Sequence, residues 1–342
     1  MHASATSSAV TRRDALRRLG LFSGAALLGA QTTSAARAAT RATPAPSLAG
    51  AQPGFYRFRI GEFEAMTLVD GQLVLPFAQS PFGLDQPPED VRAALQEGFL
   101  PTEEVRLGID VLLVRTKQDL VLVDGGCGKL FGPVGGRLLQ HLATAGIQPD
   151  QVTAVILTHL HGDHFGGLFD AEFKTPVFKN ARYIIGRREH DFWLNATDLP
   201  ASRLPAEARQ QSIQSAQVVI QALKGKWERV SNGDQVIDGI EFLETPGHTP
   251  GHLSVVFSSG QEQLVNHADV LHHHQLSFAH PEWHLAFDVD PTLAAETRRR
   301  VLDRAATARQ RIFGVHLPFP GLGRVRSVSG RFEYVSEPWQ PV

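Results

Sequence analysis

The chain has only one cysteine among its 342 residues, and its acidic and basic side chains nearly balance. A single cysteine excludes a disulfide within the chain, and we interpret Cys127 as a small packing residue. The first 38 residues hold five Arg and one Asp, so the remainder carries 28 basic and 34 acidic residues, a net charge of −6. This mildly acidic balance indicates that the protein binds neither nucleic acid nor an anionic membrane.

The N-terminal region also lacks a hydrophobic run long enough to cross a bilayer. Leu19–Ala30 has 12 apolar or small residues, too few for a hydrocarbon layer of about 30 Å, so no stable membrane insertion is expected. Arg12 and Arg13 precede this run and Ala36-Arg37-Ala38 follows it, which predicts a twin-arginine signal peptide over residues 1–38. An amphipathic helix or an uncleaved anchor is the alternative. We therefore expect export by the twin-arginine machinery to the periplasm or the outside, with a flexible linker over residues 39–54.

Six consecutive residues, from His159 to His164, contain three histidines and one aspartate. They come directly behind Val152–Leu157, an apolar run that predicts a buried strand. Histidine nitrogen and carboxylate oxygen are the usual ligands of zinc and similar divalent ions. In an extended loop His159 and His161 point the same way, while Asp163 and His164 follow a glycine and can face a second ion. The loop is therefore predicted to serve two neighbouring metal positions.

Three further residues of ligand type come directly or shortly after strand-like runs later in the chain. They are His248 after Ile240–Glu244, Asp269 at the end of Gln263–Ala268, and His316 after Arg311–Val315. Side chains at strand ends commonly form active sites, because a rigid sheet positions the loops that follow it. A metal-binding protein without activity is the non-enzyme alternative, but such a dead site would be expected to lack a ligand, and none is missing.

Strand-like runs alternate with helical patterns from residue 55 onward, which predicts an α/β sandwich in one domain over residues 55–342. The predicted strands are Tyr56–Ile60, Glu64–Val69, Val111–Arg115, Leu120–Val123, Val152–Leu157, Arg182–Ile185, Ile240–Glu244, Leu253–Phe257, Gln263–Asn266 and Arg311–Val315. The predicted helices are Pro88–Glu97, Val134–Ala145, Glu207–Leu223 and Pro291–Ala308.

The order of these motifs resembles the metallo-β-lactamase-fold hydrolase superfamily. The resemblance rests on T-H-x-H-x-D-H at Thr158–His164, G-H-T-P-G-H at Gly247–His252, and the later Asp269 and His316. Within the superfamily the chain resembles the methyl parathion hydrolases and related lactonases most, through Leu122–Gly126, Leu130–Pro133, Asp191–Leu194 and His316–Gly321. The resemblance implies an αββα sandwich, in which two central mixed β-sheets carry helices on their outer faces.

The resemblance also implies a set of metal ligands. The first ion would be held by His159, His161 and His248, the second by Asp163, His164 and His316, and Asp269 would bridge the two ions. Zinc is the first expectation, with Mn²⁺, Fe²⁺ or Co²⁺ left open because such sites discriminate poorly. Asp124 would orient a ligand by a hydrogen bond, with a turn-capping role as the alternative.

Specificity is expected from other residues. The resemblance places Phe131 and Trp193 in an aromatic substrate pocket, although both could equally be core residues. We expect His272 to reach this pocket. His252 is expected to pack or hydrogen-bond, whereas His267 could either tune Asp269 or point into the sheet. Gly162 stands where the family often has proline, which leaves the identity of the substrate open.

The predicted function is that of an exported dinuclear-metal hydrolase acting on a small molecule. A water held between two cations has its pKa lowered towards about 7, which gives a bridging hydroxide at neutral pH. Asp163 and Asp269 are the catalytic candidates, with Asp163 accepting or relaying the proton of that water. The expected substrates are lactones, aryl esters or organophosphate triesters, and the alternative enzyme is a glyoxalase-like thioesterase or another metallo-hydrolase of the superfamily. A homodimer is left open, because no feature of the sequence establishes an interface.

Overall fold

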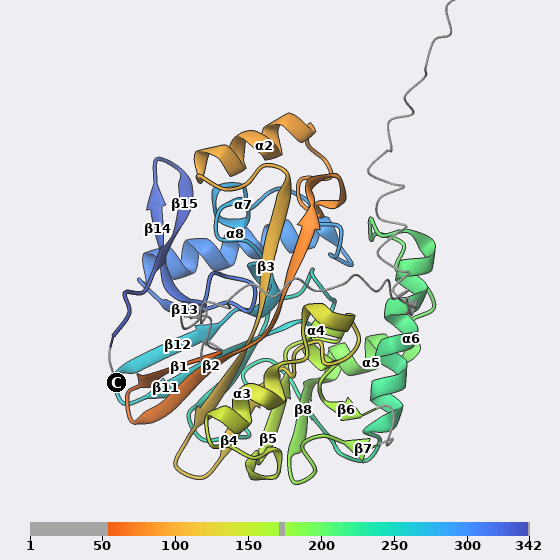
Figure 1. The fold of residues 1–342 in the computed structure, drawn as a ribbon, viewed down its shortest axis with the longest axis vertical. Helices are drawn as coiled ribbons and strands as arrows, with labels where there is room; N and C mark the ends of the chain where they lie inside the picture. Colours follow the sequence, from red (N-terminus) through yellow and green to blue (C-terminus); the bar gives the residue numbers. More distant parts are fainter. Residues whose placement is uncertain (1–53, 171–174, 341–342) are drawn as a thin grey trace, which may run out of the picture.

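The computed structural model describes residues 54–170 and 175–340 (Figure 1). The predicted signal peptide, residues 1–38, and all of the predicted linker except Gly54 lie outside this part of the chain. Within the described residues no helix is both long and apolar enough to cross a membrane.

The first sheet has seven strands in the order β1-β2-β3-β4-β5-β8-β9. The strands are β1 (Phe55–Ile60), β2 (Phe63–Pro76), β3 (Glu104–Arg115), β4 (Leu120–Val123), β5 (Ala154–Leu157), β8 (Arg182–Gly186) and β9 (Trp227–Val230). Neighbouring strands pair antiparallel from β1 through β2 and β3 to β4. From β4 through β5 and β8 to β9 they pair in parallel. Every residue of β4 and β5 is buried, which explains why these two strands are continuous apolar runs.

The second sheet has six strands in the order β10-β11-β12-β13-β14-β15. They are β10 (Ile240–Glu244), β11 (Leu253–Ser259), β12 (Glu262–Asn266), β13 (Arg311–Phe313), β14 (Leu322–Val328) and β15 (Arg331–Ser336). Only β12 and β13 pair in parallel, and α8 (Pro291–Thr307) lies in the long connection between them. A small separate ladder joins β6 (Phe169–Asp170) to β7 (Thr175–Pro176).

The remaining helices are α2 (Pro88–Glu97), α3 (Leu138–Thr144), α4 (Gly162–Phe165), α5 (Arg187–Asn195), α6 (Ala206–Ala222) and α7 (Leu276–Ala279). Short 3₁₀ turns cover Phe77–Gln79, Gly132–Val134, Pro149–Gln151 and Ala268–Val270. Figure 1 shows α5 and α6 together on one side of the molecule and α8 against β14 on another.

Apolar side chains fill the space between the two sheets and the spaces under the helices. Between the sheets, Ile156 of β5 belongs to the same buried cluster as Phe242 of β10. On the outer face of the first sheet, Ile185 clusters with Ile220 of α6, and a further cluster joins α8 to the second sheet. The layers therefore run helix, sheet, sheet, helix, and the predicted αββα sandwich is confirmed.

The structure also corrects several predicted elements. Helix α2 has the predicted bounds, but β2 and β3 extend well beyond their predicted ranges and pack against α2 at one end of the molecule. The elements that were not predicted from the sequence are β6, β7, β9, β14, β15, α4, α5 and α7. Since α5 follows β8 directly, a helix stands beside the predicted metal loop where none was expected.

Candidate metal centre

The first group of ligand-type residues lies where β4 and β5 end side by side. His159, His161, Asp163 and His164 follow β5, and the last two lie in the single turn of α4. Because β4 and β5 are parallel, Asp124 at the end of β4 lies at the same edge of the sheet. One sheet edge therefore presents the whole predicted loop together with its predicted supporting carboxylate.

The second group comes from three strand ends of the other sheet. His248 follows β10, Asp269 lies in the 3₁₀ turn after β12, and His316 comes after β13. Stacking of the two sheets brings these residues to the first loop. Four overlapping sets of three side chains then have ligand atoms within 4.8 Å of one another, and all seven predicted metal ligands belong to these sets.

One metal position is marked by three imidazole nitrogens that converge. Nε2 of His248 lies 2.8 Å from Nδ1 of His161 and 3.2 Å from Nε2 of His159. Burial lowers the pKa of both His159 and His161 well below the usual value, which keeps them neutral, and the neutral imidazole is the form that binds a metal ion.

The second position is formed around Asp163 and two histidines. Nε2 of His316 lies 3.5 Å from one Asp163 oxygen, and Nε2 of His164 lies 3.9 Å from the other. Asp269 stands between the two positions. Its Oδ1 is 3.2 Å from Nε2 of His164, and its Oδ2 is 3.3 Å from Nε2 of both His248 and His316. A single carboxylate thus faces both sets of ligands.

The donor set fits a pair of divalent metal ions. Nε2 of His164 and Oδ1 of Asp269 are buried and have no hydrogen-bond partner among the described residues, although both face the cluster. Buried polar atoms normally have partners, and a pair of cations would satisfy these two. Imidazole and carboxylate ligands of this kind suit zinc and related divalent ions.

Each of three ligand histidines is held by a hydrogen bond on its outer nitrogen. Nδ1 of His164 is 2.9 Å from Asp124, and Nδ1 of His248 is 2.9 Å from Asp288. Nδ1 of His316 is 2.6 Å from the backbone oxygen of Gly108. Such partners fix the ring and its tautomer so that Nε2 faces the metal. The structure thus gives Asp124 the expected supporting geometry, and it adds two supports that were not predicted from the sequence.

Arg298, a buried residue of α8, supports His248 from behind. Its Nη2 lies 3.3 Å from the second oxygen of Asp288, and its other nitrogens donate to three backbone oxygens, those of Val270, Pro281 and Trp283. The Asp288 carboxylate is fully buried, so an isolated charge there would be costly. The ion pair with Arg298 and the bond to His248 together stabilise it.

The three predicted substrate residues, Phe131, Trp193 and His272, lie in three different environments. Phe131 is half-buried, and its ring lies 3.4 Å from where a side-chain Cβ on Gly162 would stand. His161, Gly162 and Asp163 are the partly exposed members of the ligand loop, so Phe131 lies at the open side of the centre. A proline in place of Gly162 would contact this ring.

For Trp193 the structure shows the core position that the sequence left open as the alternative to the substrate pocket. Its side chain is 0% exposed, it belongs to the core under the first sheet, and its Nε1 donates to Glu189 at 2.6 Å. A fully buried ring whose N–H already donates a hydrogen bond within the core does not line a pocket open to substrate. The ring instead lies edge-on to His161, with centroids 5.8 Å apart.

His272 does reach the centre, but as a buried residue. Its Nε2 is 3.1 Å from Oδ2 of Asp269, and its ring stacks on that of His316 at 5.6 Å. His252 accepts a hydrogen bond from the backbone N–H of Asp269 at 3.2 Å, which agrees with its expected packing role. His267 lies 3.2 Å from the Ser254 hydroxyl, with burial lowering its pKa to about 4.

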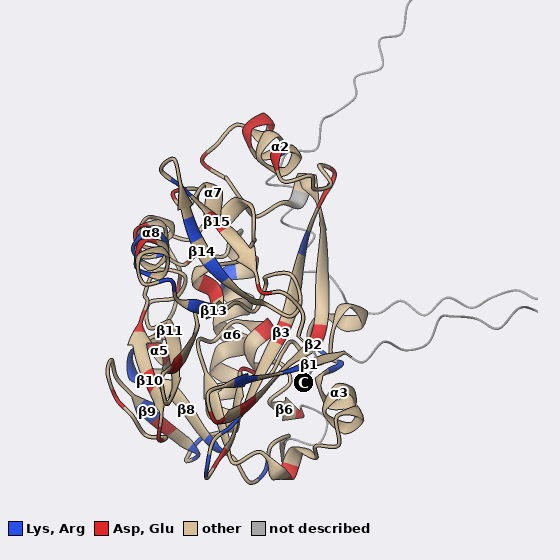
Figure 2. Ribbon diagram, turned by 90° about the vertical axis from the view of Figure 1, so that its left-hand side faces the viewer, with Lys and Arg blue, Asp and Glu red and all other residues tan. Residues whose placement is uncertain are grey.

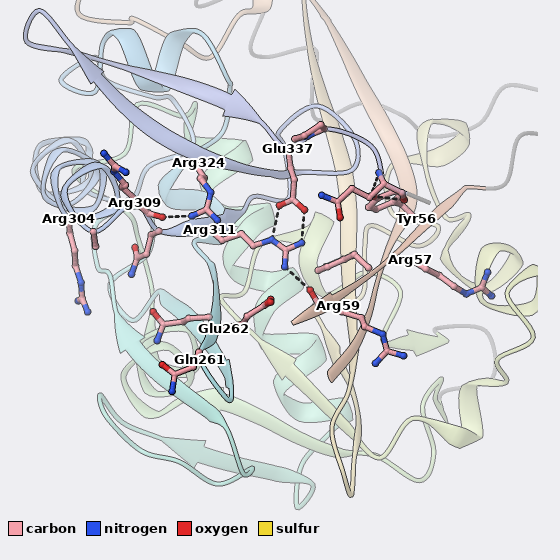
Figure 3. Close-up of a pocket in the computed structure, with 16 residues that line it drawn as sticks. Tyr56, Arg57, Arg59, Gln261, Glu262, Arg304, Arg309, Arg311, Arg324 and Glu337 are labelled. Atoms are coloured by element: carbon pink, nitrogen blue, oxygen red, sulfur yellow. Dashed lines mark hydrogen bonds and ion pairs between the residues drawn. The ribbon is translucent and has the colours of Figure 1, made fainter. Parts of the chain in front are cut away.

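A concave region also lies apart from this centre. Its volume is about 1000 Å³, and it is lined by parts of β1, β12, α8, β14 and the C-terminal segment, with none of the ligand residues (Figure 3). Arg311 makes two bonds of 2.7 Å to Glu337 on its wall. Figure 2 shows basic residues of α8 and β14 on this side of the molecule. This groove is basic, and it is distinct from the metal centre.

The sequence and the fold agree on the family. Residues 105–316 match the Metallo-beta-lactamase superfamily, and this range includes every ligand of the centre. The chain belongs to this superfamily. With its overlapping ligand sets and with lactonases among its relatives, it is a metallo-hydrolase of lactonase-like type with a dinuclear site.

Among solved structures, AidC, described as a dizinc quorum-quenching lactonase with a bound product, is 33% identical. The similarity covers 84% of this chain and 99% of AidC, with a TM-score of 0.80. The hydrolase AbOPH is 30% identical over 84% of this chain and 99% of its own, with a TM-score of 0.76. An N-acyl homoserine lactonase of Bacillus cereus is 28% identical over 51% of this chain and 68% of its length.

Proposed function

We propose that the protein hydrolyses N-acyl homoserine lactones at a dinuclear zinc centre. The observation that carries this proposal is the geometry of Asp269. Its Oδ2 lies 3.3 Å from Nε2 of His248 at the three-imidazole position, and its Oδ1 lies 3.2 Å from Nε2 of His164 at the other position. The similarity to AidC, which extends over almost the whole of that lactonase, supports the choice of substrate.

Residue roles follow from the geometry. His159, His161 and His248 would hold one ion, Asp163, His164 and His316 the other, and Asp269 would contact both. Two divalent ions bound there would supply a water of lowered pKa and a Lewis acid for the ester carbonyl. Asp163 is partly exposed at the open side of the centre, so its carboxylate is placed to accept a proton from the attacking water.

The open side of the centre also suits an acyl chain. Phe131 lies over Gly162 there, and the neighbouring Leu130 is 52% exposed. Apolar side chains beside a polar reacting centre are typical of small-molecule sites that bind an amphipathic ligand. The acyl chain of the substrate would lie along these two residues, with the lactone ring towards Asp163.

The test is hydrolysis by the purified protein across a panel of four substrates, with metal content measured on the same sample. The panel holds an N-acyl homoserine lactone, an aryl ester, methyl parathion and a thioester. Preference for the lactone, lost on chelation and restored by zinc, is the expected result. Preference for methyl parathion would assign the centre to phosphotriesters, and preference for the thioester would assign it to the glyoxalase-like alternative.

Export is a separate proposal that rests on the sequence alone. A twin-arginine signal over residues 1–38 would deliver the folded protein, with its metals already bound, to the periplasm or beyond. Replacing Arg12 and Arg13 together with lysine should retain the protein inside the cell. Unchanged localisation of this variant in cell fractions would contradict the proposal.

A further inference from the structure

A second buried carboxylate, Glu189, lies beside the metal centre without facing it. It belongs to the first turn of α5, directly after β8, and its side chain is fully buried. It is not among the side chains whose ligand atoms cluster at the centre. Its position and its partners suggest a different task.

The two oxygens of Glu189 serve two different ligand loops. Oε1 accepts a hydrogen bond from the backbone N–H of Leu160 at 2.9 Å, and Leu160 stands between the ligands His159 and His161. Oε2 accepts from the Thr249 hydroxyl at 2.7 Å and from the N–H of Gly251 at 3.0 Å, both just after the ligand His248. One carboxylate thus ties the loop of the first sheet to the loop of the second.

Close packing reinforces this connection. A Cβ on Gly251 would lie 2.1 Å from the backbone nitrogen of Glu189, so the start of α5 and the His248 loop are in direct backbone contact. Trp193, one helical turn after Glu189, donates its Nε1 to Oε1 at 2.6 Å. The Trp193 ring also lies edge-on to His161, so Trp193 contacts both the Glu189 carboxylate and the ligand His161.

We propose that Glu189, locked by Trp193, is a positioning residue that sets the spacing of His159, His161 and His248 at the first metal position. The three imidazoles come from two loops on two sheets, and Glu189 bonds directly to both loops. Its removal would leave buried N–H and hydroxyl groups without partners and would free the loops to move relative to one another. This inference rests on the proposed metal centre, but it does not depend on which substrate is hydrolysed.

The test uses Glu189→Gln, which keeps the shape of the side chain. The amide has one oxygen, so it cannot accept from both Leu160 and Gly251. Partners that orient metal ligands typically contribute 10- to 100-fold to affinity, and we expect the first position to bind Zn²⁺ or Co²⁺ about tenfold more weakly, with the second position less affected. Trp193→Phe keeps an aromatic ring, although a smaller one, and removes the indole N–H, and a smaller loss at the same position is expected.

Three readouts separate positioning from simple stability. They are metal affinity by competition with a chelator, the visible spectrum of the Co²⁺-loaded protein, and thermal unfolding of the metal-free protein. Glu207→Gln is the matched control, because Glu207 is an exposed glutamate in the first turn of α6. The proposal predicts weaker affinity and an altered Co²⁺ spectrum for the two site variants, and unchanged values for the control.

Wild-type affinity and an unaltered spectrum in both site variants would overturn the proposal, even if their unfolding temperatures fell. If Glu189→Gln does not fold, Trp193→Phe decides alone. A wild-type protein that binds metal and shows the predicted variant effects, yet does not cleave lactones, would reject the proposed substrate and leave the role of Glu189 supported. A wild-type protein that binds no metal would overturn both.

Discussion

The two halves of the metal centre are built in different ways. The half from the first sheet is one loop, in which four ligands lie within six residues from His159 to His164. The half from the second sheet is three single residues, His248, Asp269 and His316, each at the end of a different strand. The first half is fixed largely by the local backbone, whereas the second exists only because the sheets stack as they do.

The supports differ in the same way. Asp124, which holds His164, lies at the neighbouring strand end of the same sheet. Asp288, which holds His248, lies in a segment before α8 and is itself held by Arg298. The dispersed half therefore depends on a chain of buried polar contacts, and it should be the more sensitive to substitutions remote from the ligands.

The largest effect is expected where the halves meet. Asp269→Asn leaves one oxygen to face two metal positions and removes the negative charge between them. Because supporting residues alone contribute up to about 100-fold, loss of this ligand should lower lactone hydrolysis by at least about 100-fold. Metal content per chain, measured by atomic spectroscopy, should fall with it. Two tightly bound metals with full activity would remove Asp269 from the bridging role.

A matched pair of substitutions sharpens the comparison of the halves. Asp288→Asn should weaken the position held by His248, and Asp124→Asn the position held by His164, each by roughly 10-fold. Stepwise competition titrations resolve the two metal-binding steps. Equal weakening of both steps by either variant would show that Asp288 and Asp124 do not support separate metal positions.

The dependence of metal binding on pH tests the second half further. Burial by itself lowers the pKa of His248, but the bonds to Asp269 and Asp288 raise it to about 9 in the metal-free protein. His248 is then protonated at pH 7, and an ion must displace that proton. Affinity at this position should therefore rise by up to about tenfold per pH unit up to about pH 9 and then level off. Calorimetry in buffers of different ionisation enthalpy measures the proton release, and its absence at pH 7 would contradict this charge state.

The smallest effect is expected outside the metal centre. Phe131→Ala removes a half-buried ring at the open side of the first loop and leaves every ligand in place. The KM for long-chain N-acyl homoserine lactones should rise a few-fold relative to short-chain ones, with metal content unchanged, since a half-buried ring contributes roughly 1 kcal/mol of apolar contact. Equal KM changes for all chain lengths would place the acyl chain elsewhere.

The cluster of ligand-type residues could be predicted from the sequence because their chemistry is local. A contiguous histidine loop behind an apolar run puts several ligand-type side chains at one strand end, and the three later ligands each follow a strand-like run. Their supports could not be predicted, because Asp288 and the carbonyl of Gly108 are defined only by tertiary packing. Glu189 and Trp193 did carry a signal, a spacing of four residues that places them on one face of a helix.

The strands that were not predicted carry a weaker sequence pattern. In the middle of β14 the buried Val325 lies between the exposed Arg324 and Arg326, and the last three residues of the strand are exposed. This alternation is the pattern of a half-exposed strand, but it is less distinct than the continuous apolar runs of β4 and β5. For Trp193 both a pocket and a core position were left open, because an aromatic residue looks the same in sequence whether it lines a cavity or a core.

Stepwise reconstitution tests directly whether the centre holds two ions. Metal-stripped protein is mixed with increasing Zn²⁺, and hydrolysis of an N-acyl homoserine lactone is measured at each step. We expect activity to rise to a plateau at two equivalents per chain, because the centre has two metal positions, each with ligands from both halves. A plateau at one equivalent, or no hydrolysis with both ions bound, would contradict a dinuclear lactonase.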